Sequence, residues 1–239
     1  DQNLYTCELT CEVDGEVSDC RTVTFGIREY SYDFVKGVFQ LSVNGERIYC
    51  KGGNWGMSEY MLRCRGAEYD LKIRLHREMN YNMIRNWIGS TTDDEFYEAC
   101  DRYGIMVFDD FWLNSHPNLP DDVFAFNRNA VEKIKRLRNH PSIAVWCGDN
   151  EVIGSLNWFE ISRNNRDRYL VNYDRFNRVI DKAVQDAIAA ARARVAKTLH
   201  CRSDEIYFTA CGSEGNNMAV TGATRPRKHW GNKIVVTGF

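Results

Sequence analysis

Residues 137–151 read LRNHPSIAVWCGDNE, and this stretch decides the fold. A helical pattern over about residues 124–137 leads into it, and a polar turn, Asn139-His140-Pro141, follows. The apolar run 142–146 then predicts a short buried strand, which ends in the polar residues 149–151. A helix followed by a short apolar strand is the repeating unit of a parallel sheet.

The same unit recurs upstream. Short strands are predicted over residues 51–55, 82–87 and 105–108, with a helix near residues 67–79 between the first two. Before the third, Thr92-Asp93-Asp94-Glu95 is a capping box that predicts a helix start, and Gly104 predicts its end. Downstream, residues 154–168 predict a polar loop, and a helix is expected from Tyr169 to about residue 199. The fold class is therefore α/β with parallel βαβ units.

Polar and tryptophan side chains gather at the ends of these strands. They are Asn54-Trp55, Arg85-Asn86-Trp87, Asp109-Asp110 with Trp112, and Asp149-Asn150-Glu151. The carboxyl ends of parallel strands face the ligand site, so we expect these residues at one face. Carboxylates and amides beside tryptophan rings are typical of a sugar site. The alternative is that the tryptophans simply cap the core.

The N-terminal residues predict antiparallel strands. Residues 1–35 contain two alternating stretches joined by Asp14-Gly15, and residues 37–52 predict a second hairpin that turns at Asn44-Gly45. Two or three strands are too few to bury a sandwich core. We therefore expect residues 1–35 to be the tail of a β-sandwich, and the chain to be a piece of something longer.

Composition sets limits on partners and compartment. The chain has 239 residues and a formal net charge of -2, which gives no global reason to bind nucleic acid or an anionic membrane surface. No stretch is long and apolar enough to predict a membrane span. Nine cysteines without a paired C-x-x-C motif favour buried, reduced thiols and a reducing compartment. We expect no metal and no cofactor.

Residues 137–151 resemble the acid/base signature of glycoside hydrolase family 2, which places Arg-Asn-His-Pro-Ser before a buried strand and Asn-Glu after it. Two departures, Ala144 and Cys147, do not touch the carboxylate. The Gly-Asp-Asn-Glu ending and the loop 162–169 look most like the β-mannosidase branch. The resemblance covers about residues 1–187, and it implies the first half of a (β/α)₈ TIM barrel.

The resemblance also implies roles for the strand-end residues. Glu151 would be the general acid/base, kept protonated by an apolar wall that Val145 and Trp146 could supply. Asn150 would hydrogen-bond the sugar 2-hydroxyl. Arg85 would position the acidic groups, and Trp87 and Trp112 would help to shape the sugar pocket. Asp110 is the remaining implied substrate contact.

Residues from about 188 to 239 are similar to another family, the cysteine desulfurases, which are pyridoxal-phosphate enzymes. The matching stretch is residues 204–219, in which Gly212 and Ser213 occupy the positions that cradle the cofactor phosphate. Cys201 and Cys211 do not match the catalytic position. The join near residue 187 resembles a recombination or gene-assembly product, with an evolved bifunctional enzyme as the alternative.

We therefore expect three parts: sandwich strands over residues 1–35, half a barrel over 36–187 and a short α/β fragment over 188–239. The expected activity is retaining hydrolysis of terminal β-glycosides, with β-mannosides favoured. Retaining hydrolysis needs a second carboxylate about 5 Å from the first. The family places it on the seventh barrel strand, so we expect this chain to be inactive alone. The alternatives are a desulfurase fragment and a non-catalytic carbohydrate-binding remnant. Half a barrel would also self-associate through its open edge.

Overall fold

The computed structural model describes residues 2–56, 64–115, 120–198, 200 and 202. Its strands are β1 (Leu4–Val13), β2 (Glu16–Gly26), β3 (Tyr30–Val35), β4 (Val38–Val43), β5 (Glu46–Ile48), β6 (Gly52–Trp55), β7 (Met83–Asn86), β8 (Met106–Asp110) and β9 (Ile143–Cys147). Its helices are α1 (Ala67–Glu78), the single 3-10 turn η1 (Trp87–Gly89), α2 (Asp94–Tyr103), α3 (Val123–Leu137), α4 (Val152–Ser155), α5 (Glu160–Asn164) and α6 (Arg166–Thr198).

The four strands β6 to β9 form one sheet in sequence order, and every neighbouring pair is parallel. Helices α1, α2 and α3 lie in sequence between successive strands. This arrangement confirms the α/β class and the parallel βαβ units that the sequence predicted. It also brings the carboxyl ends of all four strands to one edge of the sheet, where the ligand sites of such sheets are found.

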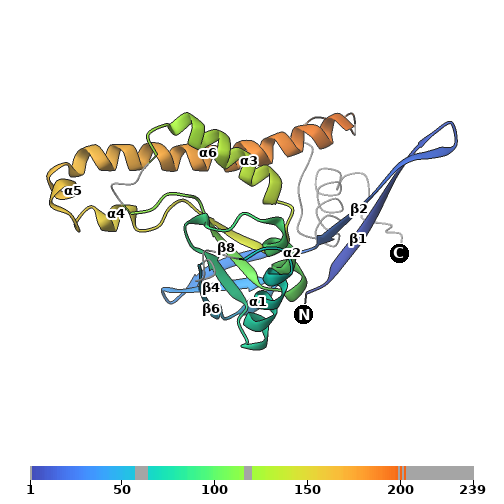
Figure 1. Ribbon diagram of the computed structural model, residues 1–239, viewed down its shortest axis with the longest axis horizontal. Coiled ribbons are helices and arrows are strands. Elements are labelled where there is room, and N and C mark those ends of the chain that lie inside the picture. The colour runs from blue at the N-terminus through green and yellow to red at the C-terminus, as the bar shows by residue number, and fades with distance from the viewer. Residues whose placement is uncertain (1, 57–63, 116–119, 199, 201, 203–239) are drawn as a thin grey trace, which may run out of the picture.

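Two apolar clusters hold the sheet and its helices together. The first joins the sheet to α1 and α2, where Ile73, Phe96, Ile84 and Val107 have at most 1% of their surface exposed. The second cluster lies between the end of β8, α3 and α6. Helix α6 runs along α3 in Figure 1. Burying one such aliphatic or aromatic side chain is worth about 1.5–3 kcal/mol, so these clusters supply most of the stabilisation.

The N-terminal strands form two separate antiparallel sheets. β1 and β2 pair with each other through the turn at Asp14-Gly15, and this long, largely exposed hairpin projects from the rest of the chain in Figure 1. The second sheet has the order β3-β4-β5, with the expected turn at Asn44-Gly45. β3 also pairs with β4 across residues 36–37, so the expected boundary between residues 35 and 36 falls inside a hairpin turn.

One arginine joins the N-terminal strands to the parallel sheet. The Arg28 guanidinium donates through Nε to the Pro141 carbonyl and through an Nη atom to the Ile143 carbonyl at 2.6 Å. Gly26 lies so close to Pro141 that an added Cβ would come within 2.8 Å of its ring. The start of β9 is therefore fixed from outside the sheet by residues more than a hundred positions earlier.

The capping box expected at residues 92–95 does not form. α2 begins at Asp94 with Asp93 at the N-cap position, and no side chain caps this helix start. The Asp93 carboxylate instead accepts a hydrogen bond from the Tyr69 hydroxyl at 2.8 Å. A hydrogen bond to α1 therefore stands in place of the expected side-chain cap at the start of α2. The expected end at Gly104 is confirmed, since this glycine adopts the left-handed conformation with φ 67°.

The polar loop expected over residues 154–168 is also wrong. Residues 154–155 belong to α4 and residues 160–164 to α5, and α6 already begins at Arg166, so most of this segment is helical. Leu156, Ser155 and Ser162 are fully buried there, so tertiary packing orders a segment whose composition is polar. α6 then continues through residue 187 without a break, and the expected join therefore falls inside one continuous helix.

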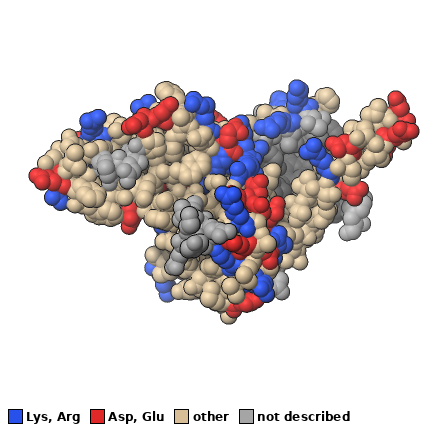
Figure 2. All heavy atoms as spheres, viewed as in Figure 1, with Lys and Arg blue, Asp and Glu red and all other residues tan. Residues whose placement is uncertain are grey.

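Charged side chains of both signs are interspersed over the middle of the face shown in Figure 2. Several form ion pairs, such as Arg102 with Asp70 at 2.7 Å and Arg136 with Asp94 at 3.0 Å. Exposed pairs of this kind contribute little to stability. Within the described ranges, no helix has the length and apolar character needed to cross a membrane.

Candidate active site

The candidate site begins with the alternation of side chains along β7 and β8. Successive strand residues point to opposite faces of a sheet. Asn86 and Asp109 therefore face the helices, where both contact Tyr97 of α2. Arg85 and Asp110 face the other side, and they contact each other across the two strands.

Arg85 and Asp110 form a two-pronged ion pair. Arg85 Nε donates to Asp110 Oδ1 at 3.1 Å, and an Nη atom donates to Oδ2 at 2.7 Å. Asp110 is fully buried, and its Oδ2 also accepts the Ile88 backbone N–H at 3.0 Å. Burial disfavours the charged guanidinium, but the hydrogen bond and charge of Asp110 outweigh it, so the pKa of Arg85 lies above its ordinary value.

The same arginine reaches Asn150, which follows β9. An Arg85 Nη atom donates to Asn150 Oδ1 at 3.0 Å. The Asn150 amide donates to Asn114 Oδ1 at 2.9 Å and lies 3.4 Å from Glu151 Oε2, while its backbone N–H donates to the Leu113 carbonyl. With 5% of its surface exposed, Asn150 has a fixed orientation. We call Arg85, Asp110, Asn114, Asn150 and Glu151 the Arg85 cluster.

Glu151 is the exposed member of the Arg85 cluster. Its backbone is left-handed, with φ 57° and ψ 20°, and it stands at the N-cap position of α4. A non-glycine residue in this conformation is uncommon and costs free energy, and such strain is concentrated at functional sites. Of the two residues expected to form an apolar wall for Glu151, Trp146 packs into the core beside Phe111, and Val145 is half-buried on β9.

A second strained turn supports Asp110. Ile88 has φ 49°, which is rare for a β-branched residue, and Gly89 has φ 61°. The Ile88 N–H donates to the Asp110 carboxylate, and the Gly89 carbonyl accepts from the Trp112 indole at 3.1 Å. No sequence pattern pointed to Ile88 or Asn114 as part of the site, and Gly89 was not among the predicted residues. Only the glycine gave a signal, as a residue suited to positive φ.

The tryptophans at the strand ends do not share one role. Trp55 is buried against Phe96, and its indole N–H donates to the Thr91 hydroxyl at 2.9 Å, so the core-capping alternative holds for this residue. Trp87 is half-buried in η1, next to Ile88. Trp112 is half-buried and lies against α3 rather than among the members of the Arg85 cluster.

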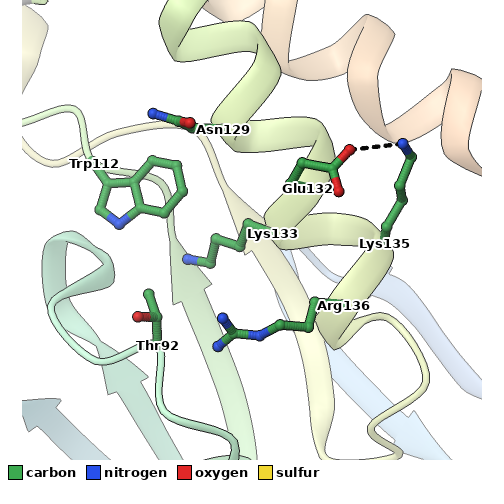
Figure 3. Close-up of a pocket in the computed structure, with 7 residues that line it drawn as sticks. All are labelled: Thr92, Trp112, Asn129, Glu132, Lys133, Lys135 and Arg136. Carbon is green, nitrogen blue, oxygen red and sulfur yellow. Dashed lines mark hydrogen bonds and ion pairs between the residues drawn. The ribbon is translucent and has the colours of Figure 1, made fainter.

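The hollow beside Trp112 has a volume of about 630 Å³. We call it the α3 pocket, and it is lined by Thr92, Trp112, Asn129, Glu132, Lys133, Lys135 and Arg136 (Figure 3). Its charged side chains already have partners: Lys135 pairs with Glu132 at 2.8 Å, Arg136 with Asp94, and Lys133 with Asp109 at 3.0 Å. We therefore place the candidate active site at the Arg85 cluster, where Glu151 is exposed.

Two further expectations concern bound groups. Gly212 and Ser213, the residues expected to cradle a phosphate, lie outside the described residues. Among the residues that are described, no group of three or more histidine, cysteine or acidic side chains is arranged to hold a metal ion.

Cys147 lies beside the Arg85 cluster, and burial raises the pKa of its thiol above the ordinary value.

A four-stranded parallel sheet with covering helices, with an acid and an amide at its carboxyl edge, fits the first half of the expected glycosidase barrel. The model of the TIM barrel domain of glycosyl hydrolases family 2 matches residues 35–200. The chain belongs to this family. The model of class-V aminotransferases matches residues 164–239, which agrees with the second resemblance in the C-terminal sequence and overlaps the first match along α6.

Curated relatives of this chain include β-mannosidases. A mannosylglycoprotein endo-β-mannosidase from Lilium longiflorum is 40% identical over 166 residues, which is 64% of this chain and 17% of that protein. A β-mannosidase B from Thermothelomyces thermophilus is 40% identical over 117 residues, covering 47% of this chain and 14% of the relative. The chain thus spans about a fifth or less of the length of these relatives.

Solved structures agree with this assignment. The β-D-mannosidase from Dictyoglomus thermophilum matches with a TM-score of 0.54 and 35% identity, over 62% of this chain and 20% of that one. A β-glucuronidase from Bacteroides uniformis matches with a TM-score of 0.63 over 75% of this chain and 22% of that one. At 22% identity, the second match shows a shared fold alone.

Proposed function

We propose that the Arg85 cluster is the acid/base half of a retaining β-mannosidase site. The observation that carries the proposal is the hydrogen-bonded chain from Asp110 through Arg85 to Asn150 and Glu151 at the carboxyl ends of β7, β8 and β9. The similarity of the chain to β-mannosidases supports the choice of a β-mannoside as substrate.

Each group then has a role that its geometry allows. In a site that also holds a nucleophile, Glu151, which is exposed, would donate a proton to the leaving glycosidic oxygen and later activate water. Asn150 is held by Arg85 and Asn114, and it offers its amide to the sugar 2-hydroxyl, a contact that strengthens in the transition state. Asp110 and Arg85 hold Asn150 in place, and the half-buried Trp87, which follows β7, contributes apolar surface near this edge.

The retaining mechanism needs a second, free carboxylate about 5 Å from the acid. Asp110 does not serve as this nucleophile, because both of its oxygens are engaged by Arg85 and Ile88. We therefore propose that this chain of 239 residues binds a β-mannoside without hydrolysing it.

The test combines binding and turnover. Methyl β-mannoside should change the tryptophan fluorescence of the protein, and a titration of this change gives the dissociation constant. We expect the dissociation constant to rise by about tenfold in Asn150→Ala, which loses the contacts to the sugar and to Glu151. Release of nitrophenol from nitrophenyl β-mannoside should stay at the level of buffer. The proposal fails if methyl β-mannoside does not bind at all. If the protein releases nitrophenol and Glu151→Gln abolishes the release, the acid role of Glu151 stands, but the proposal that the chain does not hydrolyse β-mannosides is refuted.

A further inference from the structure

A lysine is buried behind the Arg85 cluster. Lys133 lies on the apolar face of α3 with Ala130, Ile134 and Leu137, and only 2% of its side chain is exposed. An ammonium group in such a position costs free energy unless it is paired. Burial lowers the pKa of Lys133, and the charge of Asp109 acts against that shift.

The Lys133 ammonium contacts both acidic residues at the end of β8. It donates to Asp109 Oδ1 at 3.0 Å and to the Asp110 backbone carbonyl at 2.7 Å. The Asp109 carboxylate also accepts from Asn86 at 2.9 Å and from the Tyr97 hydroxyl at 3.1 Å. The lysine therefore completes a buried polar network that ties α2, α3, β7 and β8 together.

Aromatic rings and a glycine enclose the ammonium. Its nitrogen lies 5.3 Å from the centre of the Phe111 ring, 5.1 Å from Trp112 and 5.9 Å from Trp146, distances at which a cation is attracted to a ring. In Figure 3 the Lys133 side chain extends from α3 toward Trp112 and Thr92. Gly89 approaches so closely that an added Cβ would come within 3.1 Å of the Lys133 nitrogen.

These contacts act on the Arg85 cluster through one residue. The carbonyl and the carboxylate of Asp110 belong to the same residue, so fixing the carbonyl limits backbone rotation at Asp110. The carboxylate then stays where it can accept both prongs of Arg85. Arg85 in turn orients Asn150 next to Glu151.

We propose that Lys133 is a positioning residue: it holds Asp110, and through Asp110 it sets the geometry of Arg85 and Asn150. The role of this geometry in sugar binding rests on the proposed function. The positioning role of Lys133 does not rest on it, because that role concerns only the Arg85–Asp110 pair of this chain. Lys133 does not touch substrate in this proposal.

The test removes the lysine without leaving a buried charge. Lys133→Met alone would leave Asp109 unpaired and could prevent folding. The variant to use is the double substitution Lys133→Met with Asp109→Asn, which removes both charges. The matched control is Lys182→Met, which removes an exposed lysine paired with Asp186 on α6.

The readout is the Arg85 Nε–H signal in nitrogen-15 NMR, identified by its loss in Arg85→Lys. We expect hydrogen exchange of this group to become at least about tenfold faster in the double variant, as for a weakened charge-assisted hydrogen bond, and to stay unchanged in Lys182→Met. A folded double variant with an unchanged Arg85 signal would overturn the proposal.

A second measurement separates this proposal from the proposed function. If the Arg85 exchange accelerates and the binding of methyl β-mannoside weakens in the double variant, both proposals gain support. If the exchange accelerates and methyl β-mannoside binds neither the variant nor the original chain, the positioning role stands and the proposed function fails.

Discussion

Replacing Gly89 by alanine tests the close packing behind the Arg85 cluster. Gly89 has φ 61°, and a Cβ added to it would lie 2.5 Å from the Asp110 carbonyl oxygen, 3.1 Å from Lys133 Nζ and 3.2 Å from Trp112 Cδ1. The nearest of these atoms belongs to the backbone of β8 and is already hydrogen-bonded to Lys133. As part of the strand backbone, this oxygen does not shift unless β8 shifts with it.

The expected loss of stability has two parts. An alanine in the left-handed conformation costs about 1–2 kcal/mol, and forcing an extra carbon into a packed site costs about 1–3 kcal/mol more. Gly104 provides a matched control, because its φ is 67° but a Cβ there meets only the mobile end of the Gln2 side chain. We therefore expect a loss of about 2–5 kcal/mol for Gly89→Ala and about 1–2 kcal/mol for Gly104→Ala.

Urea denaturation followed by tryptophan fluorescence gives both free energies of unfolding, provided that the denaturant slopes of the variants agree. The difference between the two variants isolates the close approach, since the conformational cost is common to both. Equal losses for Gly89→Ala and Gly104→Ala would refute the reasoning, because Gly89 would then have room for a side chain.

Four further predictions concern other parts of the chain. Arg28→Met should lower the free energy of unfolding by about 1–3 kcal/mol in urea denaturation, because it removes the hydrogen bonds to the Pro141 and Ile143 carbonyls. The control Arg21→Met, on the exposed hairpin, should have little effect. Glu151→Gly should raise the free energy of unfolding by about 0.5–1 kcal/mol through relief of its left-handed backbone, and a loss of stability would contradict this. Asp122 caps α3 by accepting the Ala125 and Phe124 N–H groups, which lowers the pKa of its carboxyl below the ordinary value. The stability that this carboxylate contributes is therefore present at neutral pH and is lost as the pH falls through the lower folded-state pKa. The free energies of unfolding of Asp122→Ala and the original chain should converge in strong acid, whereas Asp122→Asn, whose amide does not titrate, should keep its advantage over Asp122→Ala there. The sheet edges at β6 and β9 should make the chain self-associate, and a single monomeric species over a wide concentration range in sedimentation velocity would show this expectation to be wrong.

Local sequence patterns predicted most of the parallel sheet correctly. The apolar runs at residues 105–108 and 142–146 are strands, and the helical spacing near residues 67–79 and 124–137 became α1 and α3. These predictions succeeded because apolar periodicity reports which face of an element is buried, whatever it packs against. The prediction at residues 92–95 failed because Asp93 pairs with Tyr69, 24 positions earlier, and the prediction at 154–168 failed because Ser155, Leu156 and Ser162 are buried by packing that their composition does not reveal.

The candidate site divides in the same way. The sequence by itself placed Arg85, Asp110, Asn150 and Glu151 at the ends of strands, and parallel strands bring such residues to one edge. Only the tertiary structure showed that Trp55 belongs to the core, that Trp112 faces the α3 pocket and that Glu151 is exposed.

Lys133 gives the physical reason for this limit. Its position on the apolar face of a helix is the one that a sequence pattern assigns to a hydrophobic residue, and its partner Asp109 lies on a strand 24 positions earlier. Periodicity decides which residues turn inward, because that depends on neighbours along the chain. The pairing of two buried charges depends on how a helix and a strand pack against each other, and only the folded chain fixes that.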